Sequence, residues 1–526
     1  MTPAQLRERL LSRGELALLD VREQGVHYKG HPFFACALPL SRLELLVGDL
    51  LPRLTAPLVL LDGGGEGLAE RASVKLREFG YTDVDILEGG CAAWRATGGE
   101  LFSGVNVPSK AFGEFVEHHY GTPRIPPTEL KRLQESGRKL VILDSRPWEE
   151  YHRMNIPGGI DAPGAELVYR TPDLAPDADT LVVVNCAGRT RSIIGCQSLR
   201  NAGWKDVVAL KDGTMGWELA GYECERGSHR VAAAPGAAGR ERARTAAEGV
   251  ARRFEVKFAR APQARAWLED AARTTYLLDV RTREEYEGGH LEGARHAPGG
   301  QLVQATDEFV GVRNARIVLV DPERVRSVMT ASWLNQMGWD DVYVLEPDSG
   351  DWPLEQGPRQ REIPGFARWD AIGARALDPA RATVIDLSTS LRFRARHVPA
   401  AWWAVRARLA EAQAKLPAPR DLVLTSDDGV LAHLAAPEAA VLWPRARVQV
   451  LAGGNAAWFA AGLPAESGIG ANATTSLDDV WYKPYDHEHG ADYEKHARAY
   501  LDWEVALVEQ IKRDPAIRFR AYDTRA

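Results

Sequence analysis

One short stretch of the sequence combines residues that can carry out nucleophilic chemistry. In VVVNCAGRTRS an apolar run ends at Cys186, and Arg189 and Arg191 follow within five positions. If Cys186 ends a buried strand and Ser192 opens the next helix, the backbone N–H groups of residues 187–192 curl around the sulfur, and the helix N-terminus adds a partial positive charge. These groups and the two arginines favour the thiolate, the nucleophilic form of cysteine. We interpret the stretch as a nucleophilic thiol that faces an anion.

The chain contains five cysteines, and the other four lack this context. Cys196 falls one helix length after Cys186, while Cys36, Cys91 and Cys224 have no basic neighbours, so we interpret these four as structural or incidental. For Cys186 the alternative is also a buried, unreactive thiol. No C-x-x-C pair occurs, which argues against zinc ribbons and dithiol redox motifs. Few, unpaired cysteines favour a reducing compartment, and we expect a cytoplasmic protein.

The same three phrases occur four times along the chain. An apolar run first closes on Asp20, Asp144, Asp279 and Asp386; a second apolar run ends at Asp62, Cys186, Asp321 and Ser426; a third leads through a turn to Trp94, Trp217, Trp352 and Trp458. The first two positions differ by 42 in three repeats and by 40 in the last, and the second and third by 31 or 32. Such a steady order indicates four tandem domains of about 100 residues each.

The elements between these positions predict the fold class. Short apolar runs that end in a polar residue are typical of buried parallel strands, and helical patterns such as SIIGCQSLRNAGW lie between them. We expect an α/β fold in which each domain has a mainly parallel five-stranded sheet with helices on both faces. Ligands of such sheets bind beyond the carboxyl ends of the strands, where Cys186 is expected to lie.

We name the four repeats units 1 to 4 and place their boundaries from these phrases. The predicted segments are unit 1 (1–102), a linker (103–125), unit 2 (126–228), a linker (229–258), unit 3 (259–358), unit 4 (366–468) and a helical C-terminal tail (469–526). The first linker is predicted to be an ordered spacer, and the second to become helical in its later part. In the tail, apolar residues at helical spacing predict an amphipathic helix that packs on the body or on another chain: Tyr500, Trp503, Val505, Leu507, Val508 and Ile511.

With these motifs in view, the chain resembles the rhodanese-type sulfurtransferases, as four tandem rhodanese-like domains over roughly residues 1–468. The motifs that carry the resemblance are DSRPWEEY, NIPGGIDAPG, VNCAGRTRS and DGTMGWELAG in unit 2, and DVRTREEYEGGHLEGA in unit 3. One departure is Asn155, which replaces the histidine that usually precedes I-P-G-A in the family. We expect Arg146 and Glu150 to form a structural ion pair.

The resemblance implies a ping-pong reaction through a persulfide. Cys186 would take the outer sulfur of thiosulfate or a similar donor, sulfite would leave, and the sulfur would pass to cyanide, a thiol or another thiophilic acceptor. The loop residues would form the cradle and bind the donor: Ala187, Gly188, Arg189, Thr190, Arg191 and Ser192. Arg189 and Arg191 would hold the sulfonate end, because guanidinium groups suit oxyanions. No cofactor is implied.

Other readings of the loop stay open. Related phosphatases of the same fold have the longer spacing C-x5-R, whereas Arg191 follows Cys186 as C-x4-R, which favours sulfur transfer over phosphatase or arsenate-reductase activity. A further alternative is a sulfur-relay or redox scaffold whose Cys186 accepts sulfur only from a partner protein.

Units 1, 3 and 4 lack the thiol, since Asp62, Asp321 and Ser426 occupy its place. An aspartate cannot carry a persulfide, and Pro322 removes one amide donor from the third loop. We expect these units to be structural, with docking of a sulfur acceptor as the alternative.

Composition limits the partners. The 526 residues are 45% apolar and 26% charged, and 65 basic against 72 acidic residues give a net charge of −7, which argues against nucleic-acid binding. No stretch reaches the roughly 18–20 apolar residues of a membrane span. We expect a small anionic sulfur donor and a thiophilic acceptor, with a protein acceptor as an alternative. The tail motif DHEHG is interpreted as a solvated turn, and no metal is expected.

Overall fold

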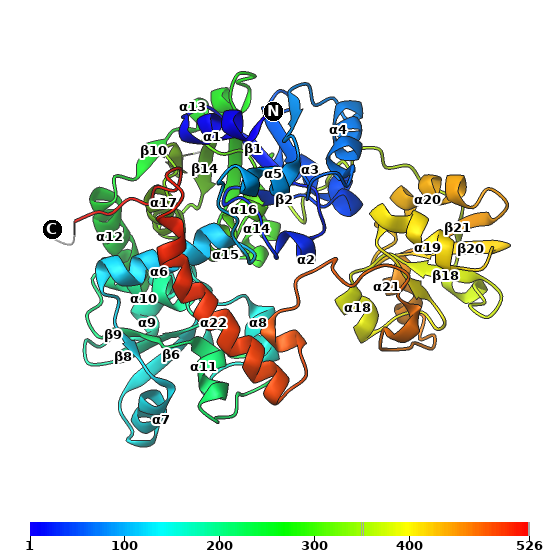
Figure 1. Ribbon diagram of the computed structural model, residues 1–526. Helices are drawn as coiled ribbons and strands as arrows, with labels where there is room; N and C mark the ends of the chain where they lie inside the picture. The colour runs from blue at the N-terminus through cyan, green and yellow to red at the C-terminus, as the bar shows by residue number, and fades with distance from the viewer. Residues whose placement is uncertain (349, 351, 524–526) are drawn as a thin grey trace.

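The computed structural model describes residues 1–348, 350 and 352–523. Figure 1 shows four α/β bodies, a long helix near the C-terminus, and the unit 4 body set to one side of the other three. The residues 524–526 of the predicted tail lie outside the described residues. Within the described part of the chain, no helix is long and apolar enough to cross a membrane.

Unit 2 contains a five-stranded sheet in which every strand pair is parallel, with the order β5-β9-β8-β6-β7. Its central strand has the sequence LVVVN and is buried at every position, as expected for a strand covered on both faces. The elements of this unit are β5 (Arg124–Ile125), α7 (Pro127–Glu135), β6 (Leu140–Asp144), α8 (Trp148–Arg153), β7 (Ile160–Asp161), α9 (Glu166–Leu174), β8 (Leu181–Asn185), α10 (Thr190–Asn201), β9 (Val207–Leu210) and α11 (Gly213–Leu219).

Units 3 and 4 repeat this strand order, as β10-β15-β14-β11-β13 and β17-β21-β20-β18-β19. The elements of unit 3 are β10 (Lys257–Ala259), α13 (Ala261–Leu268), β11 (Thr275–Asp279), α14 (Arg283–Gly288), β12 (His290–Leu291), β13 (Arg295–His296), α15 (Gly299–Gln304), α16 (Thr306–Phe309), β14 (Arg316–Val320), α17 (Arg326–Gln336), β15 (Val342–Leu345) and β16 (Leu354–Glu355). Those of unit 4 are β17 (Ala371–Ile372), β18 (Thr383–Asp386), α18 (Ser390–Ala395), β19 (Trp402–Trp403), α19 (Leu409–Lys415), β20 (Asp421–Thr425), α20 (Val430–Leu442), β21 (Arg447–Leu451) and α21 (Gly454–Ala460).

Unit 1 differs from the prediction, because its sheet has four strands in the order β2-β1-β3-β4 rather than five. The first edge strand of the other units is replaced here by Met1, whose ammonium group donates to the carbonyl of Ile86 at 2.8 Å and whose carbonyl accepts from the amide of Glu88. The elements of unit 1 are α1 (Pro3–Leu11), β1 (Ala17–Asp20), α2 (Gln24–His27), β2 (Cys36–Ala37), α3 (Leu43–Leu50), β3 (Leu58–Leu61), α4 (Leu68–Glu78), β4 (Val84–Ile86) and α5 (Gly90–Ala96).

Three long helices lie outside the four units. The predicted first linker contains α6 (Val107–Tyr120), and the second contains α12 (Ala237–Arg253), which packs against α9 and α17. The predicted tail contains α22 (Ala491–Ile511), which packs against α6 and crosses it in Figure 1. One continuous apolar core runs through units 1, 2 and 3, whereas unit 4 has core clusters of its own. The linker helices and α22 thus belong to the body that carries unit 2.

The buried face of α22 differs from the predicted apolar face by one position. Val505, predicted to be buried, is 46% exposed, whereas the neighbouring Glu504 is completely buried. The other buried residues of the helix are Tyr493, Ala497, Leu501 and Leu507. Glu504 is turned inward because its carboxylate accepts a hydrogen bond from Thr190 of the Cys186 loop. Glu504 thus shares the buried face of the helix with apolar residues.

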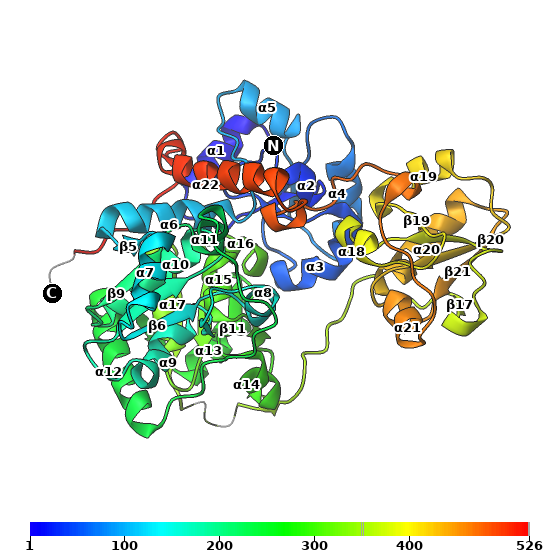
Figure 2. The same cartoon turned by 90° about the horizontal axis from the view of Figure 1, so that it is seen from below.

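A further segment links unit 4 to the rest of the protein. Residues 478–486, which we call the strap, lead from unit 4 across unit 1 towards α22, and the path is visible in Figures 1 and 2. The amide of Trp481 donates to Gln24 at 3.2 Å, and the indole stacks on Tyr28 with ring centres 5.4 Å apart. In unit 4, Ser390 donates both its amide and its hydroxyl to the carboxylate of Asp479. The strap is fixed at both units.

Candidate functional site

Cys186 follows directly after β8, at the carboxyl end of the central strand of unit 2. Its thiol is 2% exposed and donates to the hydroxyl of Ser192 at 3.4 Å, and that hydroxyl donates to the carbonyl of Arg189 at 2.9 Å. Helix α10 begins at Thr190, two residues before the predicted start at Ser192. The loop is therefore only three residues long after Cys186, which brings the free amides of the first helical turn close to the sulfur.

The backbone of Cys186 is held by a glycine in the next loop. Gly213 has a φ of 56°, and a Cβ at this position would lie 2.3 Å from the carbonyl oxygen of Cys186. Thr214 donates its amide to the same carbonyl at 2.9 Å. Gly90 and Gly454 approach the carbonyls of Asp62 and Ser426 in the same way. Only glycine permits both the positive φ and this close approach, so the repeated glycine of the third phrase positions the loop.

The three units without the thiol show where the loop amides point. In unit 3 the carboxylate of Asp321 accepts from the amides of Arg326 at 2.8 Å and Ser327 at 3.3 Å, and in unit 1 the carboxylate of Asp62 accepts from the amide of Leu68 at 3.1 Å. These amides correspond by position to those of Arg191 and Ser192 in unit 2. In both units the loop therefore binds an anion supplied by its own side chain. In unit 2 the same position carries the sulfur of Cys186.

This arrangement predicts a stability effect at Asp321. Its side chain is buried and also accepts from the guanidinium of Arg326 at 3.0 Å, which is itself 1% exposed. We expect Asp321→Ala to lower the free energy of unfolding by about 2–3 kcal/mol, because amides and a buried guanidinium lose an acceptor. Denaturant unfolding measures the effect. The control is Asp179→Ala, whose side chain is 71% exposed; equal stability of the two variants would contradict the anion-filled loop.

The two arginines of the Cys186 loop are both paired with carboxylates. Arg189 is 5% exposed and bonds to Glu114 at 2.6 and 2.7 Å, to Glu117 at 2.6 Å and to Asp212 at 3.2 Å. Because its donors already hold three carboxylates, Arg189 fastens the loop to α6 and to the loop before α11. The geometry does not support its predicted role in binding the donor.

Arg191 forms a two-point pair with Glu150, with N–O distances of 2.9 and 2.8 Å. The guanidinium of Arg191 and its hydrogen bonds lower the pKa of Glu150 to about 2 against the effect of burial, so the carboxylate is charged at neutral pH. The predicted pair between Arg146 and Glu150 is wrong. Arg146 bonds to Asp144 at 2.8 and 2.7 Å instead, and Glu150 turns to Arg191. The sequence could not show which arginine pairs with Glu150. Arg146 lies shortly before it and Arg191 further after it, and the pairing depends on the folded loops.

Most of the predicted loop residues line one cavity together with Cys186. Ala187, Gly188, Thr190, Arg189 and Arg191 line the cavity that also contains Cys186, and Ser192 lies beneath it as the partner of the thiol. A Cβ on Gly188 would lie 3.2 Å from the ring of Tyr500 and 3.3 Å from the carboxylate of Glu504. The loop is therefore covered by α22 of the tail.

The cavity at Cys186 has a volume of about 490 Å³ and is built from most of the chain. Gln24 comes from unit 1, Lys110 from α6, Gln301 from unit 3, Leu391 from unit 4 and Tyr485 from the strap. Sequence reasoning assigned the site to unit 2 alone. The tail residues were missed because their apolar spacing indicated packing and gave no sign of which loop they cover.

Tyr485 connects the strap directly to the Cys186 loop. Its hydroxyl donates to the carbonyl of Ala187 at 3.1 Å and lies 2.7 Å from the hydroxyl of Thr214. On α22, Glu504 accepts from the hydroxyl of Thr190 at 2.6 Å, and Lys110 lies 3.4 Å from the same oxygen. The strap and α22 therefore hold opposite sides of the loop.

A buried carboxylic acid lies at the far edge of the same sheet. Asp161 is 3% exposed, and its Oδ1 has no hydrogen-bond partner among the described residues. Burial raises the pKa of Asp161 to about 8, and the charge on Asp144 adds to the effect. The folded protein therefore holds a proton that an unfolded aspartate, with an ordinary pKa of about 3.9, releases.

This proton predicts a dependence of stability on pH. Between about pH 4 and pH 8 the folded state binds more protons than the unfolded state at Asp161, so the free energy of unfolding falls as pH rises. Asp161→Asn stays neutral and removes this contribution. We therefore expect the melting temperature of the variant, relative to that of the wild type, to rise between pH 5 and pH 8. Parallel profiles for the two proteins would contradict a protonated Asp161.

Asn155 is completely buried and serves the fold. Its side-chain amide donates to the carbonyl of Tyr151 at 3.3 Å, and its backbone pairs with Glu225. The thiols of Cys36, Cys91 and Cys196 are buried and Cys224 is partly buried, and burial raises the pKa of each. These four thiols were interpreted from the sequence as structural or incidental, and their burial fits that interpretation.

The tail motif DHEHG contributes to one cluster of metal-ligating types. His487, Asp492 and His496 have potential ligand atoms within 4.8 Å of one another. However, the two imidazoles are stacked with centres 3.5 Å apart and planes at 11°, and Nδ1 of His496 lies 2.8 Å from the carbonyl oxygen of Asp492. Stacked rings direct their nitrogen lone pairs side by side and not at one point. The absence of a metal stays a prediction.

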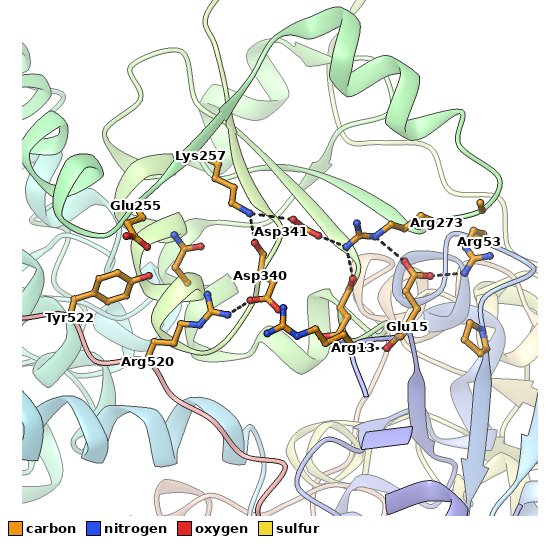
Figure 3. A pocket seen from close by; sticks show the side chains of 15 residues that line it. Arg13, Glu15, Arg53, Glu255, Lys257, Arg273, Asp340, Asp341, Arg520 and Tyr522 are labelled. Carbon is orange, nitrogen blue, oxygen red and sulfur yellow. Dashed lines mark hydrogen bonds and ion pairs between the residues drawn. The ribbon is translucent and has the colours of Figure 1, made fainter. Parts of the chain in front are cut away.

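Another cavity lies away from Cys186, between units 1 and 3 and the C-terminal segment. It has a volume of about 800 Å³, and Figure 3 shows that charged side chains line it. Arg53 bonds to Glu15 at 2.5 Å, Arg273 bridges Glu15 and Asp341, and Lys257 lies 3.3 Å from Asp341. These ion pairs connect residues of units 1 and 3 across the cavity. No cysteine is among the described residues that line it.

Comparison with known proteins agrees with the fold. The sequence matches the rhodanese-like domain family over residues 2–97, 126–220 and 261–352, which together make up more than half of the chain. The chain belongs to this family, and the resemblance inferred from the motifs is confirmed. Unit 4 lies outside the matched residues but has the same strand order as units 2 and 3.

The whole chain is similar to a crystal structure of a thiosulfate sulfurtransferase from Pseudomonas aeruginosa. The two are 45% identical, the alignment covers 99% of each chain, and the TM-score is 0.93. Among curated proteins, it is 36% identical over 110 residues to the HTH-type transcriptional regulator Rv0324 of Mycobacterium tuberculosis, covering 20% of this chain and about half (48%) of that protein. It is 25% identical over 133 residues to the putative sulfur carrier protein YrkF of Bacillus subtilis, covering 24% of this chain and 71% of that protein.

Proposed function

We propose that this protein is a sulfurtransferase that moves sulfane sulfur from thiosulfate to a thiophilic acceptor through a persulfide on Cys186. The observation that carries the proposal is the position of Cys186 in a loop whose counterparts in units 1 and 3 bind a carboxylate with the same amides. The similarity over the full length to a protein named thiosulfate sulfurtransferase supports the choice of donor.

The proposed reaction has two half-reactions. The thiolate of Cys186 attacks the outer sulfur of thiosulfate, a new S–S bond forms, and the S–S bond of the donor breaks as sulfite leaves with its electron pair. An acceptor such as cyanide or a thiolate then attacks the terminal sulfur and restores the cysteine thiolate. The amides of residues 187–192 stabilise the negative charge on the persulfide. Burial of Cys186 keeps bulk water from this intermediate.

Release of sulfite without an acceptor tests the proposal. Mixing the protein with excess thiosulfate is expected to release about one equivalent of sulfite per chain in a single burst, because the persulfide accumulates. If thiosulfate gives no sulfite but a partner protein persulfide transfers sulfur to Cys186, the protein is a sulfur relay. Hydrolysis of a phosphate ester that depends on Cys186 would instead indicate a phosphatase.

A further inference from the structure

We propose that Lys483 of the strap supplies the positive charge that receives the anionic end of the sulfur donor. This inference rests on the proposed function and identifies the donor-binding group of the same site. Lys483 lines the cavity of Cys186 although it lies in sequence about 300 residues after the catalytic loop.

The loop arginines leave no net positive charge for a dianionic donor. Arg189 faces three carboxylates and Arg191 faces Glu150, so the carboxylates outnumber the two guanidinium groups. With both guanidinium groups paired, the loop arginines offer a free anion no unpaired positive charge at long range.

The other cations that line the cavity are also paired. Arg146 is buried and bonds to Asp144, and Lys110 lies 3.4 Å from Glu504. Arg153 donates to the carbonyl of Tyr485 at 3.0 Å and lies 3.8 Å from Asp486. Each of these groups has an acceptor that a donor molecule would have to replace.

Lys483 differs from them in one respect. Among the described residues, its ammonium group has neither an ion-pair partner nor a hydrogen-bond acceptor. Its charge acts on Glu150, the partner of Arg191, and contributes to the lowered pKa of that carboxylate. Lys483 is exposed, lines the cavity and lies within electrostatic range of the Arg191–Glu150 pair.

The strap fixes the backbone from which this ammonium group extends. Lys483 is followed by the short helical turn Pro484–Asp486, and the amide of Lys483 donates to Asp486 at 3.0 Å. Tyr485 in that turn is bonded to Ala187 of the loop. The backbone next to Lys483 is thus tied to the same loop that holds Cys186, so its charge is presented to a donor at the sulfur. Unit 4, which lacks a thiol, serves the reaction by anchoring this segment.

Binding of thiosulfate to a form that cannot react tests the inference. Calorimetric titration of thiosulfate into Cys186→Ser is compared with titration into the double variants Cys186→Ser/Lys483→Ala and Cys186→Ser/Lys483→Arg. We expect Lys483→Ala, which removes the positive charge, to weaken binding about 10-fold at low salt. Lys483→Arg, which keeps the charge, is expected to retain most of the affinity. The matched control is Lys131→Ala, a lysine of α7 that pairs with Glu135 on the surface.

The outcomes separate this inference from the proposed function. Equal affinity with and without the Lys483 ammonium group would overturn the role of Lys483, while a burst of sulfite from the wild type would leave the proposed function in place. If the wild type releases no sulfite but Lys483→Ala still weakens thiosulfate binding, the anion site is supported and the reaction is not. A loss of affinity in Lys131→Ala of the same size would also overturn the assignment, because it would show a general charge effect.

Discussion

Replacement of Cys186 by alanine is expected to abolish sulfur transfer while leaving the fold intact. The thiol is the nucleophile in the proposed reaction, and no other cysteine lies at a strand end with free helix amides, since Cys36, Cys91, Cys196 and Cys224 are placed elsewhere. We expect turnover with thiosulfate and cyanide to fall at least about 10³-fold, as for the loss of other catalytic nucleophiles. Thiocyanate formation measures the effect.

The matched control for this variant is Cys196→Ala. Cys196 is completely buried in the apolar core on α10, ten positions from the nucleophile, and its thiol donates to the backbone carbonyls of Pro123 and Val207. We expect this variant to keep most of its turnover with a modest loss of stability, because it removes a small buried side chain. Full activity of Cys186→Ala would contradict the assignment of the nucleophile.

Gly25→Ala is expected to impair the same reaction from unit 1, which has no thiol of its own. Gly25 lies in α2, and a Cβ there would be 2.6 Å from the carbonyl oxygen of Asp478 and 2.7 Å from that of Val480. Because both contacts are backbone atoms, the strap must move, and Lys483 and Tyr485 move with it. A displacement of about 1 Å can cost about 10²-fold in rate. We expect kcat/KM for thiosulfate to fall between about 10-fold and 100-fold.

A glycine with open surroundings provides the control. Gly48 lies in α3 of the same unit, and a Cβ there meets no atom within 4 Å. Gly48→Ala is expected to keep wild-type turnover and to gain up to about 1 kcal/mol of stability, since alanine is the better helix former. If Gly25→Ala has the kcat/KM of Gly48→Ala, the strap does not determine the activity of unit 2.

The position of the nucleophile could be predicted from the sequence because it depends on local patterns. The apolar run before Cys186 predicted β8, and the repeat predicted an equivalent loop in every unit. These features rest on residues close together in the chain, where periodicity and spacing are informative.

The surroundings of the loop could not be predicted in the same way. The partners of Arg189 are Glu114 and Glu117, which lie in a segment that the sequence indicated only as a spacer. Glu504 and Lys483 lie about 300 positions away, and their approach to the loop depends on how the units pack. The apolar pattern of α22 placed Val505 inward, whereas the hydrogen bond to Thr190 placed Glu504 there. A charge partner leaves no periodic signal, so its identity requires the three-dimensional structure.

The units without a thiol have a clear use in this account. Their aspartates or serine complete the loops internally, and their surfaces form the walls around Cys186 and hold the strap. We infer that units 1, 3 and 4 keep the loop because it stabilises their folds. The amides of the turn need an anion or a polar atom at the centre, and the aspartate or serine side chain supplies it. The catalytic unit is one part of a cavity that the whole chain builds.

The most direct test of the central claim is the intact mass of the protein after incubation with thiosulfate and removal of the excess. The account predicts that the wild-type chain gains the mass of one sulfur atom, that cyanide removes it, and that Cys186→Ala gains nothing. An unchanged mass of the wild type, or an equal gain in Cys186→Ala, would contradict a persulfide on Cys186.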